Sequence, residues 1–309
     1  MTYSLFIDGA VGTTGLEIAE RLQGRSEFER IVLPEDKRKD AAARAEALNV
    51  ADFVILCLPD DAAKEAVALI ENDHTRVIDA SSAHRVAPNW VYGFPEFKAG
   101  QRDAVRNASR VSNPGCYPTG FLALVAPLVS AGLIPADWPY TVNAVSGYSG
   151  GGKALIERFE AEGDVAFRAY GLNMGHKHLP EMQQQAGLTH APIFAPAVVP
   201  AHRGMLVEVP LPVGPMKAAG ADELRAALAD HYADERLVIV HDGDAPGELL
   251  LKQGCAPSDR MDLYVFGSAD GSQVRLIAML DNLGKGASGA AVQSLNLMSG
   301  ADEYAGLSF

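Results

Sequence analysis

The first 130 residues of this chain alternate between short apolar runs and segments with helical periodicity, and this alternation constrains the fold more than any other feature. The apolar runs span residues 3–8, 30–33, 53–58, 76–79 and 110–112, and the helical segments span residues 16–22, 41–48 and 62–70. Short apolar runs bounded by Gly, Pro or Asp are typical of strands in a parallel sheet that is covered by helices on both faces. The first part of the chain is therefore predicted to form a doubly wound, Rossmann-type α/β domain.

The second part of the chain, from about residue 138, has a different pattern. Predicted strands span residues 140–146, 194–199, 205–211, 236–240, 263–267 and 274–280, and predicted helices span about 154–162, 180–186 and 221–232. Several of the strands show two-residue alternation, which is typical of half-buried strands. The pattern predicts an α+β domain with a mixed, largely antiparallel sheet that has one exposed or interface face. A last helix, at residues 287–298, is expected to pack back on the first domain.

The net charge restricts the possible partners. The chain has 26 Lys and Arg against 39 Asp and Glu, which gives a net charge of −13. Such a surface repels phosphate backbones and anionic lipids, so neither nucleic acid nor a membrane is expected as a partner. A small anionic ligand would have to be held by local cations. Four cations stand beside glycine- or histidine-rich loops: Arg85, Lys153, Lys177 and Arg203.

The cysteine content and the first residues of the chain indicate the cellular compartment in which the protein works. Cys57, Cys116 and Cys255 are too few and too scattered for a disulfide framework, and no CxxC pair suggests zinc or a redox motif. The first residues lack the basic region and long apolar core of an export signal. The longest apolar stretch, residues 121–135, is too short to cross a bilayer. We therefore expect a protein of the reducing cytoplasm.

A glycine-rich turn follows the first predicted strand. Gly9, Gly12 and Gly15 have the spacing GxxGxxG, and a helical run comes next. Glycines let the backbone approach a pyrophosphate closely, and the N–H groups at the start of the helix can bind the anion. Thr13 and Thr14 add hydroxyl donors. A glycine-rich surface turn is the alternative, but the position between strand and helix favours a dinucleotide site.

The residues after the second predicted strand indicate which dinucleotide binds. An acid near the end of this strand is typical of NAD enzymes, whereas cations there can hold the 2′-phosphate of NADP. Here Glu35 and Asp36 are followed by Lys37, Arg38 and Lys39. A basic run stands out in an acidic chain, so Lys37 and Arg38 favour NADP. A solvated cluster of charges is the alternative.

Residues 112–120 contain the candidate nucleophile. A strand ends, an Asn113-Pro114-Gly115 turn follows, and Cys116 stands just before Pro118 at the predicted start of a long apolar helix. A thiol at the N-terminus of a helix is held toward the thiolate by the helix dipole. Backbone N–H groups and the Asn113 amide could form an oxyanion hole. A small buried hydrophobe is the alternative for any cysteine, and we accept it for Cys57.

Two histidines supply a candidate acid and base. His176 and His178 stand two residues apart before a helix, and Glu181 could orient an imidazole as the third member of a Cys–His–acid set. A metal site is the other interpretation, but the two histidines lack a third ligand at a recognised spacing. A thiolate beside a nicotinamide indicates attack on an acyl centre, followed by hydride transfer to the thioester.

Taken together, five motifs resemble those of N-acetyl-gamma-glutamyl-phosphate reductases of the shorter type, in the aspartate-semialdehyde-dehydrogenase-like superfamily. They are Gly9-x-x-Gly12-x-x-Gly15, residues 112–119, Ser146-Gly147-x-Ser149-Gly150, His176-Lys177-His178-x-Pro180-Glu181 and Asp281-Asn282-x-x-Lys285-Gly286. The cysteine and histidine motifs are the specific ones, and the glycine turn is generic. At Pro34-Glu35 the sequence departs from longer members, which often carry Ser or Arg there.

The resemblance implies reduction of N-acetyl-L-glutamyl 5-phosphate by NADPH to the 5-semialdehyde with release of phosphate, in arginine biosynthesis. It implies Cys116 as nucleophile and His178 as acid and base, with His176 against the substrate. The phosphate or carboxylates would lie near Ser81, Ser82, Arg85, Asn113, Ser149, Gly150 and Arg203. The cofactor would also touch Pro59, Ser81, Asn282 and Gly286.

The expected organisation follows from these assignments. Residues 1–116 would form the dinucleotide-binding domain, completed by a C-terminal helix within residues 285–309, and residues 117–284 would form the catalytic and oligomerisation domain. A homodimer or homotetramer is expected. Two other interpretations stay open: an aspartate-semialdehyde dehydrogenase or related acyl-phosphate reductase, and a non-catalytic dinucleotide-sensing protein.

Overall fold

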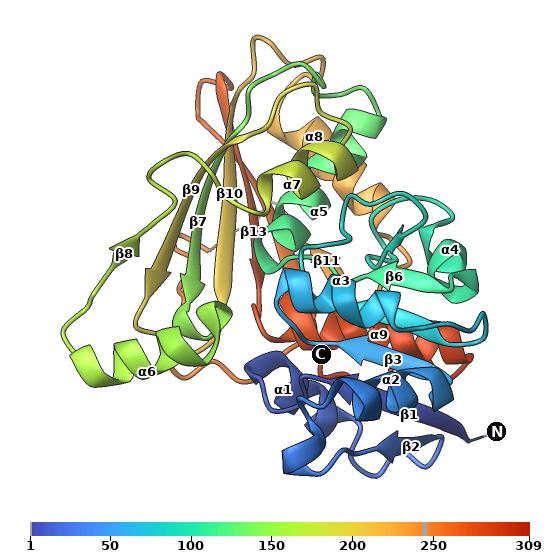
Figure 1. Cartoon of the computed structure of the whole chain (residues 1–309). Helices are drawn as coiled ribbons and strands as arrows, with labels where there is room; N and C mark the ends of the chain where they lie inside the picture. The colour runs from blue at the N-terminus through green and yellow to red at the C-terminus, as the bar shows by residue number, and fades with distance from the viewer. Residues whose placement is uncertain (1, 243–245) are drawn as a thin grey trace. The chain divides into compact units, whose positions relative to one another are not determined.

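The computed structural model describes residues 2–242 and 246–309, which form two compact units (Figure 1). The first unit comprises the chain up to Pro95, Gly100–Pro114 and Ala287–Leu307. The second comprises Glu96–Ala99, Gly115–Gly286 and Ser308–Phe309. Each unit is built around a sheet of its own.

The sheet of the first unit has six strands, all parallel, in the order β2-β1-β3-β4-β6-β5. Its strands are β1 (Tyr3–Asp8), β2 (Phe28–Ile31), β3 (Phe53–Leu56), β4 (Arg76–Asp79), β5 (Val91–Tyr92) and β6 (Arg110–Ser112). The register places the last residues of four strands in one row, because Asp8 pairs with Leu56, Leu56 with Asp79, and Asp79 with Ser112. The loops that follow these four strands therefore leave the sheet at one edge.

Helices cover both faces of this sheet, as the sequence predicted. Its helices are α1 (Thr13–Arg21), α2 (Ala41–Val50), α3 (Asp60–Ala68), α4 (Gln101–Asn107) and α9 (Gly289–Ser299). Alternate strand residues enter two cores: Leu5 and Ile55 pack with α1 and α9, whereas Phe6 and Val54 pack with α2 and α3. This period of two, repeated in neighbouring strands, makes the sheet doubly wound.

The second unit has a mixed sheet in the order β11-β12-β13-β10-β7-β9-β8. Its strands are β7 (Thr141–Gly147), β8 (Arg168–Ala169), β9 (Ile193–Val199), β10 (Met205–Pro212), β11 (Val238–Val240), β12 (Met261–Gly267) and β13 (Gln273–Leu280). Within the part of the unit that the structure describes, the β11–β12 and β7–β9 pairs are parallel and the other strand pairs are antiparallel. The predicted mixed, largely antiparallel sheet is confirmed.

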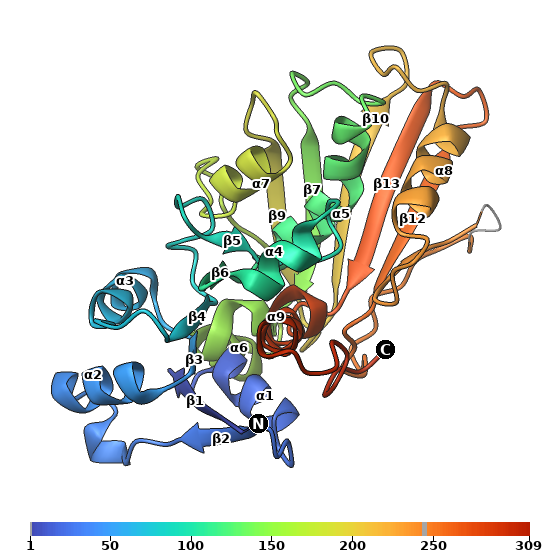
Figure 2. The same ribbon diagram turned by 90° about the vertical axis from the view of Figure 1, so that its right-hand side faces the viewer.

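One face of the second sheet is covered by helices, which lie in front of it in Figure 2. The helices of this unit are α5 (Cys116–Ser130), α6 (Gly152–Glu162), α7 (Leu179–Gln185) and α8 (Ala221–His231). The helix α5 packs so closely on β10 that a Cβ added to Gly120 would lie 2.9 Å from a methyl carbon of Val207. Burial alternates along β10, where Met205, Val207 and Val209 are buried and the residues between them are half-buried.

Several short elements differ from the sequence expectations. The strands β5 and β8 have two residues each, and α4 buries only Gln101 and Val105, so their patterns are too short or too polar to be recognised. A π-helix at Gly284–Ser288 precedes α9 and was not predicted. Among residues 2–242 and 246–309, no helix is both long and apolar enough to span a bilayer.

Candidate active site

Cys116 is the first residue of α5 and is half-buried. The preceding Gly115 is the N-cap, and its backbone N–H donates to Oε1 of Glu181 at 2.7 Å. Thr119 Oγ1 donates back to the Gly115 carbonyl at 2.9 Å. The cysteine is therefore fixed at the positive end of a fifteen-residue helix, where the dipole favours the thiolate.

Two imidazoles lie close to the residue after the nucleophile. The ring centroids of His176 and His178 are 4.7 Å apart, and the Tyr117 ring lies 6.4 Å from the first and 6.0 Å from the second. The backbone N–H of His178 donates to Nδ1 of His176 at 3.2 Å, so the proton of a neutral His176 is on Nε2. His178 itself is buried at the start of α7.

Glu181 is buried, and its contact with Gly115 gives it a role that the sequence analysis did not predict. Its Oε1 accepts the N–H of the turn that carries Cys116. The expected role of this carboxylate in orienting an imidazole stays a prediction. A buried carboxylate bonded to a backbone N–H makes a strong, charge-assisted hydrogen bond. Glu181 therefore joins α7 to the start of α5.

Two tyrosines beside the nucleophile were also missed by sequence reasoning. Tyr117 donates from its hydroxyl to the Ala197 carbonyl at 3.0 Å, and the Tyr170 ring lies 5.6 Å from that of His176. Burial raises the pKa of Tyr117 far above its usual range. Burial also raises the pKa of Tyr170, to about 12, and the charge of Cys116 acts in the same direction on both phenols. Both hydroxyls therefore stay protonated at neutral pH and can donate hydrogen bonds only as neutral groups.

Gly286 makes a close approach to the nucleophile from the π-helix. A Cβ added to Gly286 would lie 2.9 Å from Cβ and 3.3 Å from Cα of Cys116. The Gly286 N–H donates to the Asp281 carbonyl at 3.0 Å. Only glycine allows this segment to pack against the first turn of α5 at that distance.

The predicted residues Ser149, Gly150, Arg203 and Asn282 come together in the second unit. Asn282 Nδ2 donates to Ser149 Oγ at 2.9 Å, and the Gly204 N–H donates to Asn282 Oδ1 at 2.8 Å. A Cβ added to Gly150 would lie 3.4 Å from Asn282 Nδ2. Arg203 is buried and paired with Asp281, with Nη1 and Oδ2 2.8 Å apart. This pairing neutralises the charge of Arg203 in part and fixes its direction.

The glycine turn of the first unit has the shape that the sequence predicted. Gly9 has φ +86°, and an added Cβ would lie 2.3 Å from the Cys57 carbonyl oxygen. At Gly15 an added Cβ would lie 2.5 Å from the Gly9 carbonyl oxygen. The turn ends at Gly12, the N-cap of α1, so Thr13 and Thr14 form the first turn of that helix. This is the geometry that binds phosphate at a helix N-terminus.

A pocket of about 700 Å³ opens beside this turn. Its walls include Gly9 and the cations Arg38, Lys39 and Arg44. Arg44 donates to Asp8 Oδ2 from Nη2 at 2.7 Å, so its position in the pocket wall is fixed. Lys37 is exposed and is not among the residues that line this pocket, and its expected contact with the cofactor stays a prediction. Arg38 and Lys39, by contrast, both line this pocket.

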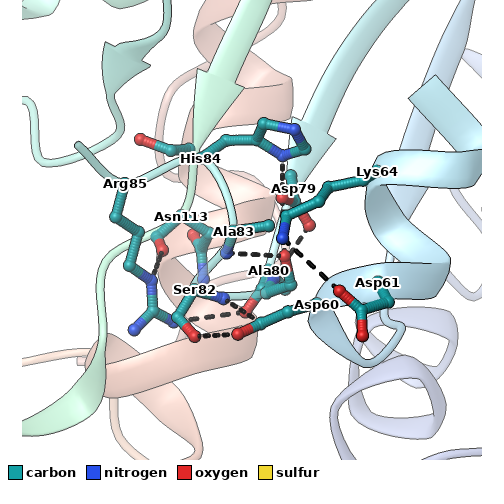
Figure 3. A network of polar contacts seen from close by, with 12 residues as sticks. Asp60, Asp61, Lys64, Asp79, Ala80, Ser82, Ala83, His84, Arg85 and Asn113 are labelled. Atoms are coloured by element: carbon teal, nitrogen blue, oxygen red, sulfur yellow. Dashed lines mark hydrogen bonds and ion pairs between the residues drawn. The ribbon is translucent and has the colours of Figure 1, made fainter. Parts of the chain in front are cut away.

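Ser81, Arg85 and Asn113 follow the ends of β4 and β6, at the carboxyl edge of the first sheet. Figure 3 shows Arg85 beside Asn113. Arg85 is buried and donates from Nε to the Asn113 carbonyl at 2.9 Å. Asn113 Nδ2 donates to the Ala287 carbonyl at 2.9 Å, so its amide is held by the segment before α9. Ser81 Oγ donates to Asp79 at 2.7 Å. Pro59 is the N-cap of α3 and stands near the same edge.

The remaining candidates are separate from these clusters. Desolvation, followed by the charges of Asp79 and Asp8, raises the pKa of the Cys57 thiol to about 12, so this thiol stays protonated. Lys153 is exposed and lies 3.9 Å from Glu157. Among the described residues, no group of three or more His, Cys, Asp or Glu side chains is arranged to hold a metal ion.

Two family models match this chain and define its class. Residues 35–108 match the semialdehyde dehydrogenase NAD-binding domain, and residues 116–282 match the semialdehyde dehydrogenase dimerisation domain. Solved structures of the same fold include aspartate semialdehyde dehydrogenase II from Vibrio cholerae, with a TM-score of 0.70 and 16% identity over 96% of this chain and 98% of that one. The Candida albicans aspartate semialdehyde dehydrogenase solved with NADP has a TM-score of 0.65 and 14% identity, over 96% of this chain and 98% of that one. At these identities the likeness concerns the fold.

Curated relatives of much higher identity define the particular family. N-acetyl-gamma-glutamyl-phosphate reductase 2 of a Nostoc species is 48% identical over 98% of each chain. The N-acetyl-gamma-glutamyl-phosphate reductase of Burkholderia orbicola is 52% identical over 96% of this chain and 97% of its own length. The chain belongs to the N-acetyl-gamma-glutamyl-phosphate reductase family. The resemblance stated from the motifs is confirmed, and the aspartate-semialdehyde alternative shares only the fold.

The close approach of Gly286 to Cys116 generates a prediction. Gly286→Ala places a methyl group against Cβ of Cys116, so either the π-helix or the start of α5 must shift. A displacement of about 1 Å at a reacting group can cost about 10²-fold in rate, so we expect kcat to fall at least tenfold while the protein stays folded. Steady-state kinetics with a thermal melt measures both.

The matched control is Gly214→Ala, where an added Cβ meets open space. It should retain the parent kcat. A Gly286→Ala enzyme with the parent kcat would show that this approach has no bearing on the nucleophile.

Proposed function

We propose that this chain reduces N-acetyl-L-glutamyl 5-phosphate to N-acetyl-L-glutamate 5-semialdehyde, with NADPH as the reductant and phosphate as the leaving group, in arginine biosynthesis. The observation that carries the proposal is the placement of Cys116 at the N-terminus of α5, against Gly286 and next to Tyr117, whose ring lies near both imidazoles. The relatives that support it are named N-acetyl-gamma-glutamyl-phosphate reductase, and this chain aligns with them over almost their full length.

In the proposed mechanism Cys116 is the nucleophile. Its thiolate forms a bond to the acyl carbon, the bond from that carbon to the phosphate oxygen breaks, and phosphate leaves. NADPH, when bound, supplies the hydride that the resulting thioester needs. His178 accepts the Cys116 proton, gives it to the oxyanion of the reduced adduct and takes it back as the carbon–sulfur bond breaks. Glu181 holds the Gly115 N–H and so fixes the turn that carries the nucleophile.

The substrate carries a phosphoryl group and carboxylates, and the proposed ligands match these charges. Arg85 and Arg203 are buried guanidinium groups, which bind carboxylate or phosphate oxygens in pairs. The remaining proposed substrate ligands are Asn113, Ser149, Gly150 and His176. Asp281 fixes Arg203, so this arginine would meet the substrate in one orientation.

The cofactor is proposed to be NADP. A nicotinamide dinucleotide fits the turn, since Gly9 and Gly15 let the turn fold tightly against main-chain atoms of Cys57 and of Gly9 itself, where a side chain would collide, and this tight turn leads into the N-terminus of α1. Arg38 and Lys39 in the pocket wall supply charge for a 2′-phosphate. The other proposed cofactor contacts are Gly12, Thr13, Thr14, Lys37, Pro59, Ser81, Asn282 and Gly286.

The domain organisation and assembly are part of the proposal. Residues 1–116 with the C-terminal helix would form the cofactor domain, and residues 117–284 the catalytic domain. We propose a homodimer or homotetramer in the cytoplasm, built on the face of the second sheet opposite α5. On that face β10 presents Leu206 and Pro210, and the family model for this region describes a dimerisation domain.

The nucleophile is tested by Cys116→Ser. The weaker nucleophile should leave less than about 1% of the turnover, because a hydroxyl at this position is not ionised at neutral pH. NADPH affinity, measured by fluorescence titration, should change less than about twofold. The assay is the phosphate-dependent oxidation of N-acetylglutamate semialdehyde. Cys255→Ser, at a half-buried loop cysteine to which the mechanism gives no role, is the matched control. Substantial turnover in Cys116→Ser would overturn the mechanism.

The acid and base is tested by His178→Asn. General acid–base catalysis is worth roughly 10²- to 10⁴-fold, and we expect a loss of kcat in this range. His190→Asn, at an exposed histidine of the same unit, should have the parent rate. If His178→Asn turns over at full rate, the role moves to His176.

Cofactor selection is tested at the pocket. Arg38→Ala and Lys39→Ala should each raise KM for NADPH about tenfold, since a charged hydrogen bond is worth about 1.5–3 kcal/mol, and should leave KM for NADH nearly unchanged. Lys64→Ala, an exposed lysine of α3, is the control. An equal change for both dinucleotides would show that these cations do not read the 2′-phosphate.

A further inference from the structure

The loop that follows β4, residues 80–85, is held by two carboxylates (Figure 3). Asp79 accepts the backbone N–H of Ser81 at 2.9 Å and its hydroxyl at 2.7 Å. Asp60, the first residue of α3, accepts the backbone N–H of Ser82 at 2.9 Å and its hydroxyl at 2.7 Å. Two consecutive residues of the loop are therefore bound through both main chain and side chain.

His84 is a further partner of Asp79. Its Nδ1 lies 2.6 Å from Asp79 Oδ2, and the carboxylate has no exposed surface. With Asp79 as a carboxylate, which only accepts hydrogen bonds, Nδ1 of His84 is the donor in this contact. The imidazole also stacks on Trp90, with ring centroids 4.1 Å apart and planes inclined by 12°. These two contacts fix the side chain of His84 in one orientation.

The next residue, Arg85, binds a main-chain carbonyl in the segment that precedes the nucleophile. Its Nε donates to the Asn113 carbonyl at 2.9 Å, and its Nη2 donates to the Ala80 carbonyl at 3.2 Å. Asn113 stands three residues before Cys116 in the sequence. Its own N–H donates to the Asp79 carbonyl at 2.7 Å. Asp79 thus binds the loop through its side chain and the nucleophile's segment through its main chain.

We infer that His84 is a positioning residue, which acts through Arg85 on the binding of an anionic group of the substrate. By bonding Asp79 and stacking on Trp90, it holds the end of the β4 loop so that the guanidinium of Arg85 keeps its direction. The inference rests on the proposed role of Arg85 as a ligand of the phosphate or a carboxylate. The mechanism assigns no part to His84.

The cost of removing His84 follows from the burial of Asp79. A buried ionised carboxylate is destabilised when a hydrogen-bond donor is lost, since no water replaces it there. Without His84, the Ser81 donors are the remaining bonds shown for this carboxylate, and they belong to the same loop. The loop then relaxes around Asp79. Arg85 is one residue beyond His84, so the main chain from which its side chain extends is no longer held in place.

The test compares His84→Leu with His84→Gln in the oxidative reaction, where KM for inorganic phosphate is measured. His84→Leu removes the donor and the ring, and we expect KM for phosphate to rise about tenfold with kcat changed less than about threefold. His84→Gln keeps an N–H donor and should recover most of the affinity. NADPH affinity should be that of the parent in both. Lys64→Ala, beside the same network but exposed, is the control.

A double-mutant cycle with Arg85→Gln separates positioning from general structure. If His84 acts through Arg85, the double variant His84→Leu/Arg85→Gln has the KM for phosphate of Arg85→Gln alone. Additive effects would overturn the inference, because His84 would then act independently. Thermal melts of each variant confirm the fold, and His84→Gln serves where His84→Leu does not fold.

The outcomes for the two assignments are distinguishable. Arg85→Gln with an unchanged KM for phosphate and for the semialdehyde would overturn both the proposed role of Arg85 and the inference about His84. A raised KM in Arg85→Gln, together with parent values in both His84 variants, would overturn the inference alone.

Discussion

The register of four parallel strands is the constraint on which the first unit depends. Because Asp8, Leu56, Asp79 and Ser112 stand in one row, the glycine turn, the start of α3, the β4 loop and the turn before Cys116 all begin at the same edge of one sheet. A slip of one residue in any of these strands would move its apolar side chains to the opposite core. The packing of both cores therefore also fixes where the chemical groups begin.

In the second unit the corresponding constraint is a set of buried hydrogen bonds and ion pairs. In the segment from Asp281 to Gly286, the side chains of Asp281 and Asn282 bond to Arg203 and Ser149, and Lys285 is paired with Glu96 at 2.7 Å with both side chains almost fully buried. Buried charges are tolerated only when paired. The π-helix over Gly284–Ser288 is the backbone form in which Lys285 meets Glu96 and Gly286 meets Cys116, and such insertions recur at functional sites.

Much of this arrangement could be predicted from the sequence, because it depends on local patterns. The period of two in strands such as residues 53–58 indicates extended backbone, and the glycines after residue 8 indicate a tight turn. The turn before Cys116 indicates the start of a helix. What could not be predicted depends on contacts between distant residues. Nothing near Glu181 shows that its carboxylate binds Gly115, and nothing in the run of Lys37, Arg38 and Lys39 shows which of them faces the pocket. The short strands β5 and β8 exist because longer neighbours pair with them.

The return of α9 to the first sheet bears on how the protein is made. The core that begins with Leu5 and Ile7 near the start of the chain is completed by Ala291, Val292 and Leu295, more than 280 residues later. During synthesis the face of the sheet under α9 stays uncovered until α9 itself has left the ribosome. The unit that contains β1 is thus completed only once α9 has been made, and a nascent chain halted before α9 would expose that apolar face to chaperones.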